Sequence, residues 1–379
     1  MADRKESKVQ RFQTLYAAFL LAGVTAFLAA GSLFGGSGPE AAENPVWRPL
    51  LHTRDHAVLQ LGRDSVRNVY VTDERLLPYS VGYDESVIAA SAQAVSDYAK
   101  AVGVPVYLLA VPTSAGIYGD LLPEAAPLVN EHAELDTLAR QLSSSVVRIE
   151  AESWLSTERE QYIYYRTDPC WTSYGAFCVY RTAIRRLGAN PLGYDHFIIS
   201  HFSDDYYGRL VQESGYREVK PDLIDLFYSD SELPPKSVTA LRPDGTEQLS
   251  SYYRQSLAKE SGDPALVFAT NSEAVLHIET ENQNNRELLL ITDRFGGNMT
   301  PFLLRHYHTV TAVNLELAQA QKTDWQALVH NGSTAYTQIL VLCGADTLRS
   351  PDFSAAMQLT KQLLPYEDQQ PEQDKGDPA

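Results

Sequence analysis

A polar pair follows an apolar run in residues 288–303, at a place where α/β proteins often carry out chemistry. Asp293 and Arg294 come directly after the expected strand 288–292. Ligands of open α/β sheets bind beyond the carboxyl ends of the strands, so the pair is predicted to lie at such a crevice. A serine at this turn would be an exposed nucleophile, whereas the Arg294 guanidinium stays protonated and cannot attack a carbonyl. It can instead bind an anionic ligand, or form a salt bridge with Asp168 or Asp293.

A second polar segment, residues 164–176, precedes an expected amphipathic helix that ends at Gly188. In a nucleophile–base–acid triad an acid such as Asp168 would orient a histidine, but Pro169 and Cys170 follow it here. Cys170 suggests a different chemistry, a thiolate nucleophile whose pKa is lowered by the helix N-terminus and by Arg294. The nine histidines of the chain include none that the sequence places to serve it.

The three cysteines and nine histidines show no metal-ligand spacing, and neither a metal nor a cofactor is expected. Cys170 and Cys178 would lie about 12 Å apart along a helix, beyond the roughly 7 Å limit between the Cα atoms of a disulfide. Cys343 is expected to be a buried thiol in an apolar strand. A disulfide between Cys170 and Cys343 is compatible with the sequence.

The elements that must position the two polar segments alternate between helix and strand. Apolar residues recur at helical spacing from Asp84 to Val102, and Val104 to Val111 is a continuous apolar run typical of a buried parallel strand. Gly296 and Gly297 are predicted to form a tight connection. This alternation predicts a mainly parallel sheet, covered on both faces and connected by right-handed crossovers. Further strands are expected at residues 69–71, 288–292, 310–315 and 338–343, and further helical stretches at 301–306 and 325–330.

The N-terminal residues predict a membrane anchor. A basic segment, residues 1–11, precedes a charge-free run whose 20-residue apolar part, residues 15–34, is long enough to span a bilayer core of about 30 Å. The apolar region of a signal peptide is shorter, so residues 12–34 are predicted to be an uncleaved transmembrane anchor, with cleavage near 26–32 as the alternative. Positive charge before the span predicts a cytoplasmic N-terminus and an extracytoplasmic main domain at the cell membrane.

The remaining chain is predicted to form one domain between two less ordered segments. Residues 35–55 are expected to be a linker, and residues 366–379 a disordered acidic tail. The domain at 56–365 carries an aromatic insertion at about residues 193–262. The net charge of −17 argues against nucleic acid as a partner.

The chain resembles the DHHW family of bacterial exported proteins, part of the SGNH-hydrolase-like group that includes the alginate O-acetylation proteins. The resemblance covers roughly residues 60–350. It implies a three-layer α/β/α sandwich with a mainly parallel sheet, preceded by one N-terminal transmembrane helix. Besides the two polar segments, it rests on Val111-Pro112-Thr113-Ser114, Tyr207-Gly208-Arg209-Leu210, Pro221-Asp222, Phe268 with Asn271, and residues 301–307.

The motifs of the family are only partly kept. Its Asp-His-His-Trp motif falls on Asp168-Pro169-Cys170-Trp171, so the acid and the tryptophan match and both histidines are missing. Cys170 takes the place of the implied base, and Arg294 takes that of the serine in an Asp-Ser pair at 293–294. Asn271 matches a position that could help to hold an oxyanion. The resemblance implies a vestigial site of Asp168, Cys170, Asp293 and Arg294, with Trp171, Asn271, Arg294 and Asp168 as candidate ligand-binding residues.

Three functions are compatible with this pattern. The favoured hypothesis is a membrane-anchored pseudoenzyme that binds a cell-envelope polysaccharide during its modification, because both catalytic positions are vacated. The alternative is an active esterase or O-acetyltransferase with a displaced nucleophile such as Cys170. The third is an assembly role beside a membrane-bound acyltransferase, without any ligand in the cleft.

Overall fold

The computed structural model describes residues 59, 64–80, 82–123, 126–229, 235–242, 244–320 and 336–360. The expected anchor, linker and acidic tail, as well as the helix expected at 325–330, lie outside the described residues. Among the helices that are described, none has the length and apolar character needed to cross a membrane.

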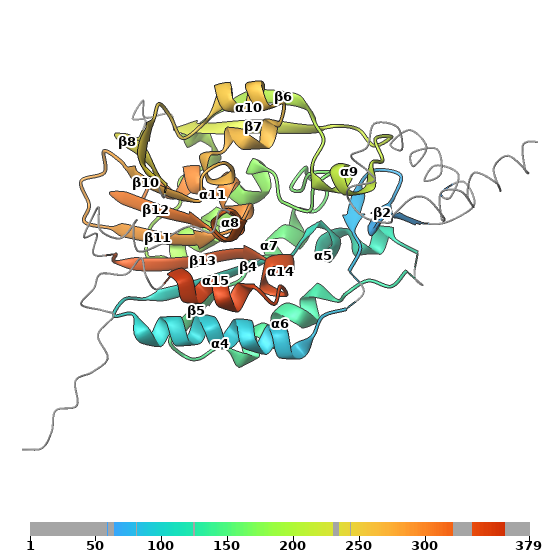
Figure 1. Ribbon diagram of the computed structural model, residues 1–379, viewed down its shortest axis with the longest axis horizontal. Coiled ribbons are helices and arrows are strands. Elements are labelled where there is room, and N and C mark those ends of the chain that lie inside the picture. The colour runs from blue at the N-terminus through green and yellow to red at the C-terminus, as the bar shows by residue number, and fades with distance from the viewer. Residues whose placement is uncertain are drawn as a thin grey trace, which may run out of the picture.

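An eight-stranded sheet runs through the centre of the described chain, in the order β5-β4-β13-β11-β12-β10-β8-β9 (Figure 1). The first five strands in this order are parallel, and the last three are antiparallel to their neighbours. The predicted mainly parallel sheet is therefore confirmed. The strands span Val146–Ile149 (β5), Val106–Val111 (β4), Gln338–Gly344 (β13), Glu287–Thr292 (β11), Thr309–Asn314 (β12), Val275–Glu279 (β10), Ser237–Arg242 (β8) and Gly245–Leu249 (β9).

Side chains of the central strands alternate between two apolar cores, as the pleat of a strand requires. Along β11, Leu288 and Leu290 face a core shared with α8 (Ser173–Arg186) and α11 (Phe295–Leu303). Leu289 and Ile291 face the opposite core, which is covered by α4 (Glu85–Ala101), α6 (Glu131–Gln141), α12 (Leu315–Ala320) and α15 (Phe353–Thr360). The sheet therefore has helices on both faces, which the strand and helix alternation predicted.

Helix ends follow ordinary capping chemistry. Asp84 precedes α4 and accepts a hydrogen bond from the Ser86 amide at 2.8 Å. Thr172 caps α8 in the same way, accepting from the Gly175 amide at 3.2 Å. Gly188, with φ of +82°, follows the end of α8 in a left-handed conformation that glycine adopts readily.

The beginning of α11 corrects one prediction. Gly296 and Gly297 are helical and do not form a tight connection before a later helix. The pair serves close packing: a Cβ on Gly296 would lie 2.4 Å from Thr292 Cγ2, and one on Gly297 would lie 2.8 Å from Asn271 Oδ1. Because both residues lack a side chain, α11 can start directly behind the strand β11.

The region 193–262 contributes to two parts of the structure. The ribbon of β6 (Phe197–Tyr206) and β7 (Asp222–Ser229) packs on α8 and α11 through aromatic rings, while β8 and β9 extend the sheet. A small sheet, β1 (Ser65–Val66), β2 (Val69–Val71) and β3 (Leu76–Pro78), shares a separate core with α9 (Arg209–Ser214). The remaining α-helices among the described residues are α5 (Ser114–Tyr118), α7 (Glu152–Thr157), α10 (Gln255–Ser261) and α14 (Ala345–Leu348).

Candidate functional site

The two polar segments meet at the carboxyl end of β11. The Trp171 indole donates a hydrogen bond to the Phe295 carbonyl at 3.0 Å, and the two rings pack edge to face with centroids 5.3 Å apart. Cys170 Sγ lies 3.9 Å from the Arg294 carbonyl oxygen. Trp171 has no exposed surface, so it links the loop to α11 and offers no face to a ligand.

Asp168 is buried and satisfied by its own chain. Its Oδ1 accepts a hydrogen bond from the Cys170 amide at 3.0 Å. Its Oδ2 accepts from the Tyr206 hydroxyl at 3.1 Å and from the Arg209 amide at 3.0 Å. Gly208 approaches the same carboxylate so closely that a Cβ there would lie 2.8 Å from Oδ2. Asp168 therefore holds the segment that carries Arg209 against the loop that carries Cys170.

Asp293 connects the ends of two neighbouring strands. One carboxylate oxygen accepts from the Phe295 amide at 2.9 Å. The other accepts from the Gly344 amide at 2.8 Å and from the Thr347 hydroxyl at 2.6 Å. Burial, and next the negative charges of Glu316 and Asp346, raise the pKa of Asp293 to about 7. The residue thus fixes the turns after β11 and β13 relative to each other.

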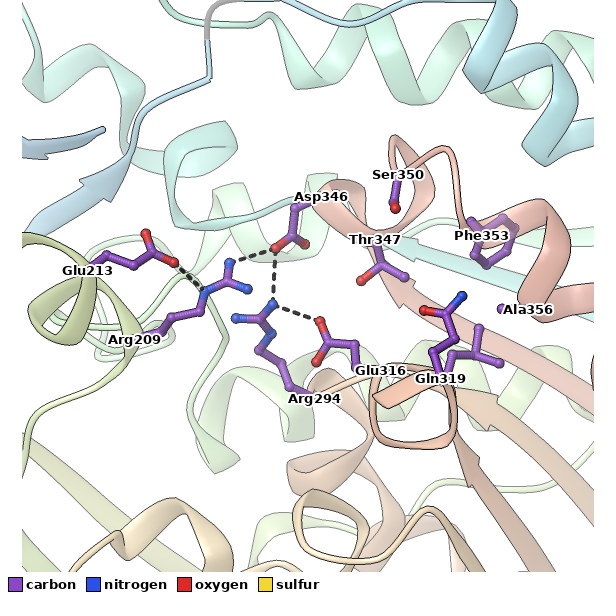
Figure 2. Close-up of a pocket in the computed structure, with 11 residues that line it drawn as sticks. Arg209, Glu213, Arg294, Glu316, Gln319, Asp346, Thr347, Ser350, Phe353 and Ala356 are labelled. Carbon is purple, nitrogen blue, oxygen red and sulfur yellow. Dashed lines mark hydrogen bonds and ion pairs between the residues drawn. The ribbon is translucent and has the colours of Figure 1, made fainter. Parts of the chain in front are cut away.

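Arg294 belongs to a network of ion pairs (Figure 2). Its Nη2 donates to Glu316 Oε1 at 2.9 Å and lies 3.4 Å from Asp346 Oδ2. The same Asp346 oxygen accepts from Arg209 Nη2 at 2.9 Å, and Glu213 pairs with Arg209 at 3.3 Å. A salt bridge was one expectation for Arg294, and it forms with these acids instead of the two that the sequence suggested. Below, these five residues are called the ion network.

The charges of the ion network stabilise one another. Burial acts to raise the pKa of Asp346, but the charges of Arg294 and Arg209 outweigh it and hold that pKa below its ordinary value. Burial likewise opposes the charge of Arg294, while Asp346 and Glu316 raise the pKa of its guanidinium well above normal. Arg294 and Asp346 are therefore both charged at neutral pH.

The ion network lines a pocket of about 340 Å³ beyond the carboxyl ends of the strands. Two guanidinium groups stand against three carboxylates, so the described lining carries a slight excess of negative charge. Opposite the charged groups lies a patch that is apolar or offers amide and hydroxyl groups (Figure 2). This patch consists of Phe353, Ala356, Gln319, Thr347 and Ser350, which Figure 2 labels, and of Leu315.

Cys170 does not have the properties of an activated nucleophile. Its side chain is buried, and burial first and the Asp168 carboxylate second raise the pKa of the thiol well above its ordinary value. Arg294 lowers that pKa, but not enough to reverse the shift. The direction is opposite to the one that the thiolate hypothesis requires. All three cysteines are free, so the bridge to Cys343 left open above does not form.

Asn271 lies behind the first turn of α11, against Gly297. Its Nδ2 donates to the Ala265 carbonyl at 3.2 Å, and its Oδ1 is buried without a hydrogen-bond partner among the described residues. The described lining of the pocket does not include it. The structure brings Asp168, Cys170 and Arg294 together. Of the residues predicted for the site, however, only Arg294 belongs to the described lining of the pocket, which leaves out Asp168, Cys170, Trp171, Asn271 and Asp293.

Four residues of the ion network, Glu316, Asp346, Arg209 and Glu213, were not predicted from the sequence as site residues, and two of them had a signal. Glu316 and Asp346 each follow the end of a parallel strand by two residues, in β12 and β13. Both positions lie beyond the carboxyl ends of parallel strands, as Arg294 does, so they are expected at the same edge of the sheet. Arg209 and Glu213 lie on α9, which joins no parallel strand. Arg209 belongs to a motif that carries the resemblance, but that motif does not assign it to this site.

Comparison with known proteins agrees with this fold. A family model described as "SGNH hydrolase-like domain, acetyltransferase AlgX" matches residues 70–202. A DHHW family protein from Eubacterium siraeum is similar in structure, with a TM-score of 0.62, 18% identity, and coverage of 79% of this chain and 97% of that one. PatB1 from Bacillus cereus, solved with a sulfonyl adduct, has a TM-score of 0.62 at 17% identity, and the match covers 75% of this chain and 97% of PatB1.

A second structure of Bacillus cereus PatB1 gives a TM-score of 0.61 at 17% identity and covers 75% of this chain and 98% of that one. A search among curated proteins found no match. The chain has an SGNH-hydrolase-like α/β fold, and its predicted resemblance to DHHW proteins and to alginate O-acetylation proteins is confirmed.

Proposed function

We propose that this protein is a catalytically inactive SGNH-like domain that binds a glycan of the cell envelope in the pocket beside Arg294. One observation carries the proposal. The position at which the resemblance implies a serine holds an arginine whose side chain is engaged by Glu316 and Asp346. The cleft is kept as a pocket, while the group that would attack an ester is replaced by one that cannot.

The lining of the pocket favours an uncharged sugar as the ligand. Gln319 and Ser350 can exchange hydrogen bonds with sugar hydroxyls, and the Thr347 hydroxyl, which donates its proton to Asp293, can accept one. Phe353 packs behind these groups and is almost fully buried. An anionic sugar is disfavoured because the carboxylates of the lining outnumber its guanidinium groups. The guanidinium of Arg294 acts in this proposal as a fixed part of the wall.

The proposed setting is the outer face of a cell membrane, with residues 12–34 as the anchor. The support is the 20-residue apolar stretch and the basic residues before it. A match to a family model named for an acetyltransferase supports a role beside polysaccharide O-acetylation. Fractionation of cells, with extraction of membranes at high pH, tests the anchor: a peripheral or secreted protein would be released.

Hydrolysis of a generic acetyl ester tests the missing catalysis. The full-length protein is compared with a double variant, Arg294→Ser with Cys170→His, which restores the residue types that the resemblance implies. We expect the parent to match the buffer rate and the double variant to exceed it. Turnover by the parent that falls about tenfold or more in Arg294→Ala or Asp168→Ala would contradict the proposal.

Binding is tested with a panel of neutral and acidic envelope polysaccharides. Gln319→Ala removes a polar group of the lining, and we expect it to weaken binding by about threefold to tenfold. Gln358→Ala is the matched control, because this glutamine is exposed on α15 and does not line the pocket. If the panel shows no binding while a membrane-bound acyltransferase co-purifies, the assembly role replaces the glycan-binding role.

A further inference from the structure

A second pocket, of about 250 Å³, lies beside the small sheet and shares no lining residue with the first. Three arginines from separate segments line it: Arg75 from the turn between β2 and β3, Arg159 after α7, and Arg166 ahead of Asp168. The segments are fixed to each other, since the Leu76 amide donates to the Arg166 carbonyl at 2.7 Å. The basic groups are therefore assembled by tertiary structure.

Arg75 is the unusual member of this set. Arg75 is only 8% exposed, yet its Nε and Nη1 atoms have no hydrogen-bond partner among the described residues. Its guanidinium carbon lies 3.5 Å from the centroid of the Tyr118 ring. Hydrogen bonds from the Thr72 hydroxyl and amide to the Arg75 carbonyl hold its backbone. A buried cation left without an acceptor is costly, so a fold that keeps one has a reason to do so.

The acids near Arg75 do not satisfy it. Asp222 is not in the described lining of the pocket and accepts from the Tyr162 hydroxyl at 2.5 Å, the Arg166 amide at 2.6 Å and the Thr167 amide at 2.8 Å. It also accepts from the Thr167 hydroxyl. Its oxygens thus serve the loop that leads to Asp168, and the closest guanidinium nitrogen of Arg166 remains 4.0 Å away.

The other charged groups of this pocket are partly committed or lie at its rim. Arg159 binds Asp120 through Nη2 at 2.7 and 2.9 Å, and the side chain of Asp120 is 61% exposed. Glu74 and Glu160 also line the pocket, and both are exposed to solvent, where their charges are screened. Positive charge is therefore concentrated at the buried end, around Arg75 and Arg166.

We infer that this second pocket binds a phosphate group. Three guanidinium groups that reach one space from different segments match the oxygens of a tetrahedral anion better than the two coplanar oxygens of a carboxylate. The bound group would supply the acceptors that Arg75 lacks. The inference concerns a site apart from the proposed glycan pocket and does not depend on it. Inorganic phosphate and a phosphorylated sugar share this chemistry.

Equilibrium dialysis of the full-length protein with labelled inorganic phosphate tests the inference. We expect one phosphate per chain, and binding that is weaker by about tenfold or more in Arg75→Met and in Arg166→Gln. Arg140→Gln, an exposed arginine on α6, and Arg294→Gln, in the first pocket, should bind as the parent does. A sugar phosphate that competes more strongly than inorganic phosphate would identify the larger ligand.

Stability of the phosphate-free protein distinguishes a binding arginine from a structural one. Since Nε and Nη1 of Arg75 lack acceptors and the Tyr118 ring only partly offsets its charge, Arg75→Met should leave the melting temperature unchanged or raise it. A lowered melting temperature together with no phosphate binding by the parent would overturn the inference. Loss of binding in Arg294→Gln, or tighter binding of glucuronate than of phosphate, would also overturn it.

Discussion

At the scale of single residues, Asp346 matters as much as the two substituted positions. It is the shared acceptor of Arg294 and Arg209, so it joins the turn after β11 to the start of α9. Its side chain is 23% exposed and that of Arg294 is 15% exposed. At such depth an ion pair is less screened than at the surface, and loss of the shared acid leaves two cations facing each other.

We predict that Asp346→Ala lowers the free energy of unfolding by about 1–3 kcal/mol. The matched control is Asp120→Ala, which breaks the ion pair with Arg159 at a side chain that is 61% exposed, and should cost less than about 1 kcal/mol. Urea denaturation of both variants measures the difference. Equal costs would show that the ion network contributes no more than an ordinary surface pair.

The resemblance implied one vestigial site for Asp168, Cys170, Asp293 and Arg294. In the structure Asp168 Oδ1 accepts a hydrogen bond from the Cys170 amide, and Cys170 Sγ lies 3.9 Å from the Arg294 carbonyl oxygen. For the Arg294 side chain, the sequence suggested Asp168 or Asp293 as the salt-bridge partner. Both acids accept backbone N–H groups instead, and that use of a carboxylate leaves no trace in a sequence pattern.

At the scale of elements, strands and long helices were predicted well, and the contacts between them were not. The apolar period predicted a helix at 84–102 and a strand at 104–111, and the structure has them at Glu85–Ala101 and Val106–Val111. The prediction of a tight connection at Gly296 and Gly297 was wrong. Glycines usually signal a turn, but here they allow close packing of α11 against neighbouring side chains. The requirement for glycine at 296 is set by the side chain of Thr292, four residues earlier, which the sharp turn from β11 into α11 brings against Gly296.

We predict that Gly296→Ala costs about 1–3 kcal/mol, because the new Cβ would lie 2.4 Å from Thr292 Cγ2 and would push α11 away from β11. Gly103→Ala is the control, since a Cβ there meets nothing within 4 Å and should change stability by less than about 1 kcal/mol. Thermal unfolding of both variants measures the contrast. A neutral Gly296→Ala would mean that α11 can move without loss.

The contact between α8 and the end of α11 predicts a pH dependence. The Tyr180 hydroxyl lies 2.7 Å from His306 Nε2, and burial first, followed by Arg286 and Arg305, lowers the pKa of His306 to about 4. Between about pH 6.5 and pH 4, His306 is therefore protonated in the unfolded chain and neutral in the folded one. This contribution to stability is complete above a pH of about 6.5 and is lost as the pH falls toward 4.

We predict that the parent loses about 2 kcal/mol through His306 between about pH 7 and pH 5, and that His306→Gln does not. Urea denaturation at both pH values measures it. Comparing the two proteins at each pH removes the effect of other groups, such as Glu134, whose pKa burial raises to about 7. His201→Gln, at an exposed histidine, controls for the loss of an imidazole. An unchanged pH dependence in His306→Gln would contradict the assignment.

At the scale of the whole molecule, the sequence predicted the parallel sheet and its helical layers but not its edge. The antiparallel hairpin of β8 and β9 comes from the aromatic region and adds to β10. Antiparallel strands can join a parallel sheet at its edge without a crossover helix. The sequence around β8 and β9 therefore has no helical pattern from which their place in the sheet could be predicted. The position of the pocket, by contrast, follows from the order of parallel strands alone.

Charge at this scale predicts how salt affects ligand binding. The chain has a net charge of −17, and the described lining of the first pocket has more carboxylates than guanidinium groups. Raising sodium chloride from about 0.05 to 0.3 M shortens the screening length from about 14 to 6 Å. At the higher salt concentration, we predict that a neutral polysaccharide keeps its affinity within about twofold. An acidic polysaccharide should bind better, because its repulsion by the carboxylates is screened. Phosphate in the second pocket should bind less well, because its attraction to the arginines is screened. Calorimetric titration at both salt concentrations measures all three, and a roughly tenfold loss of neutral-glycan affinity would exclude the first pocket as described.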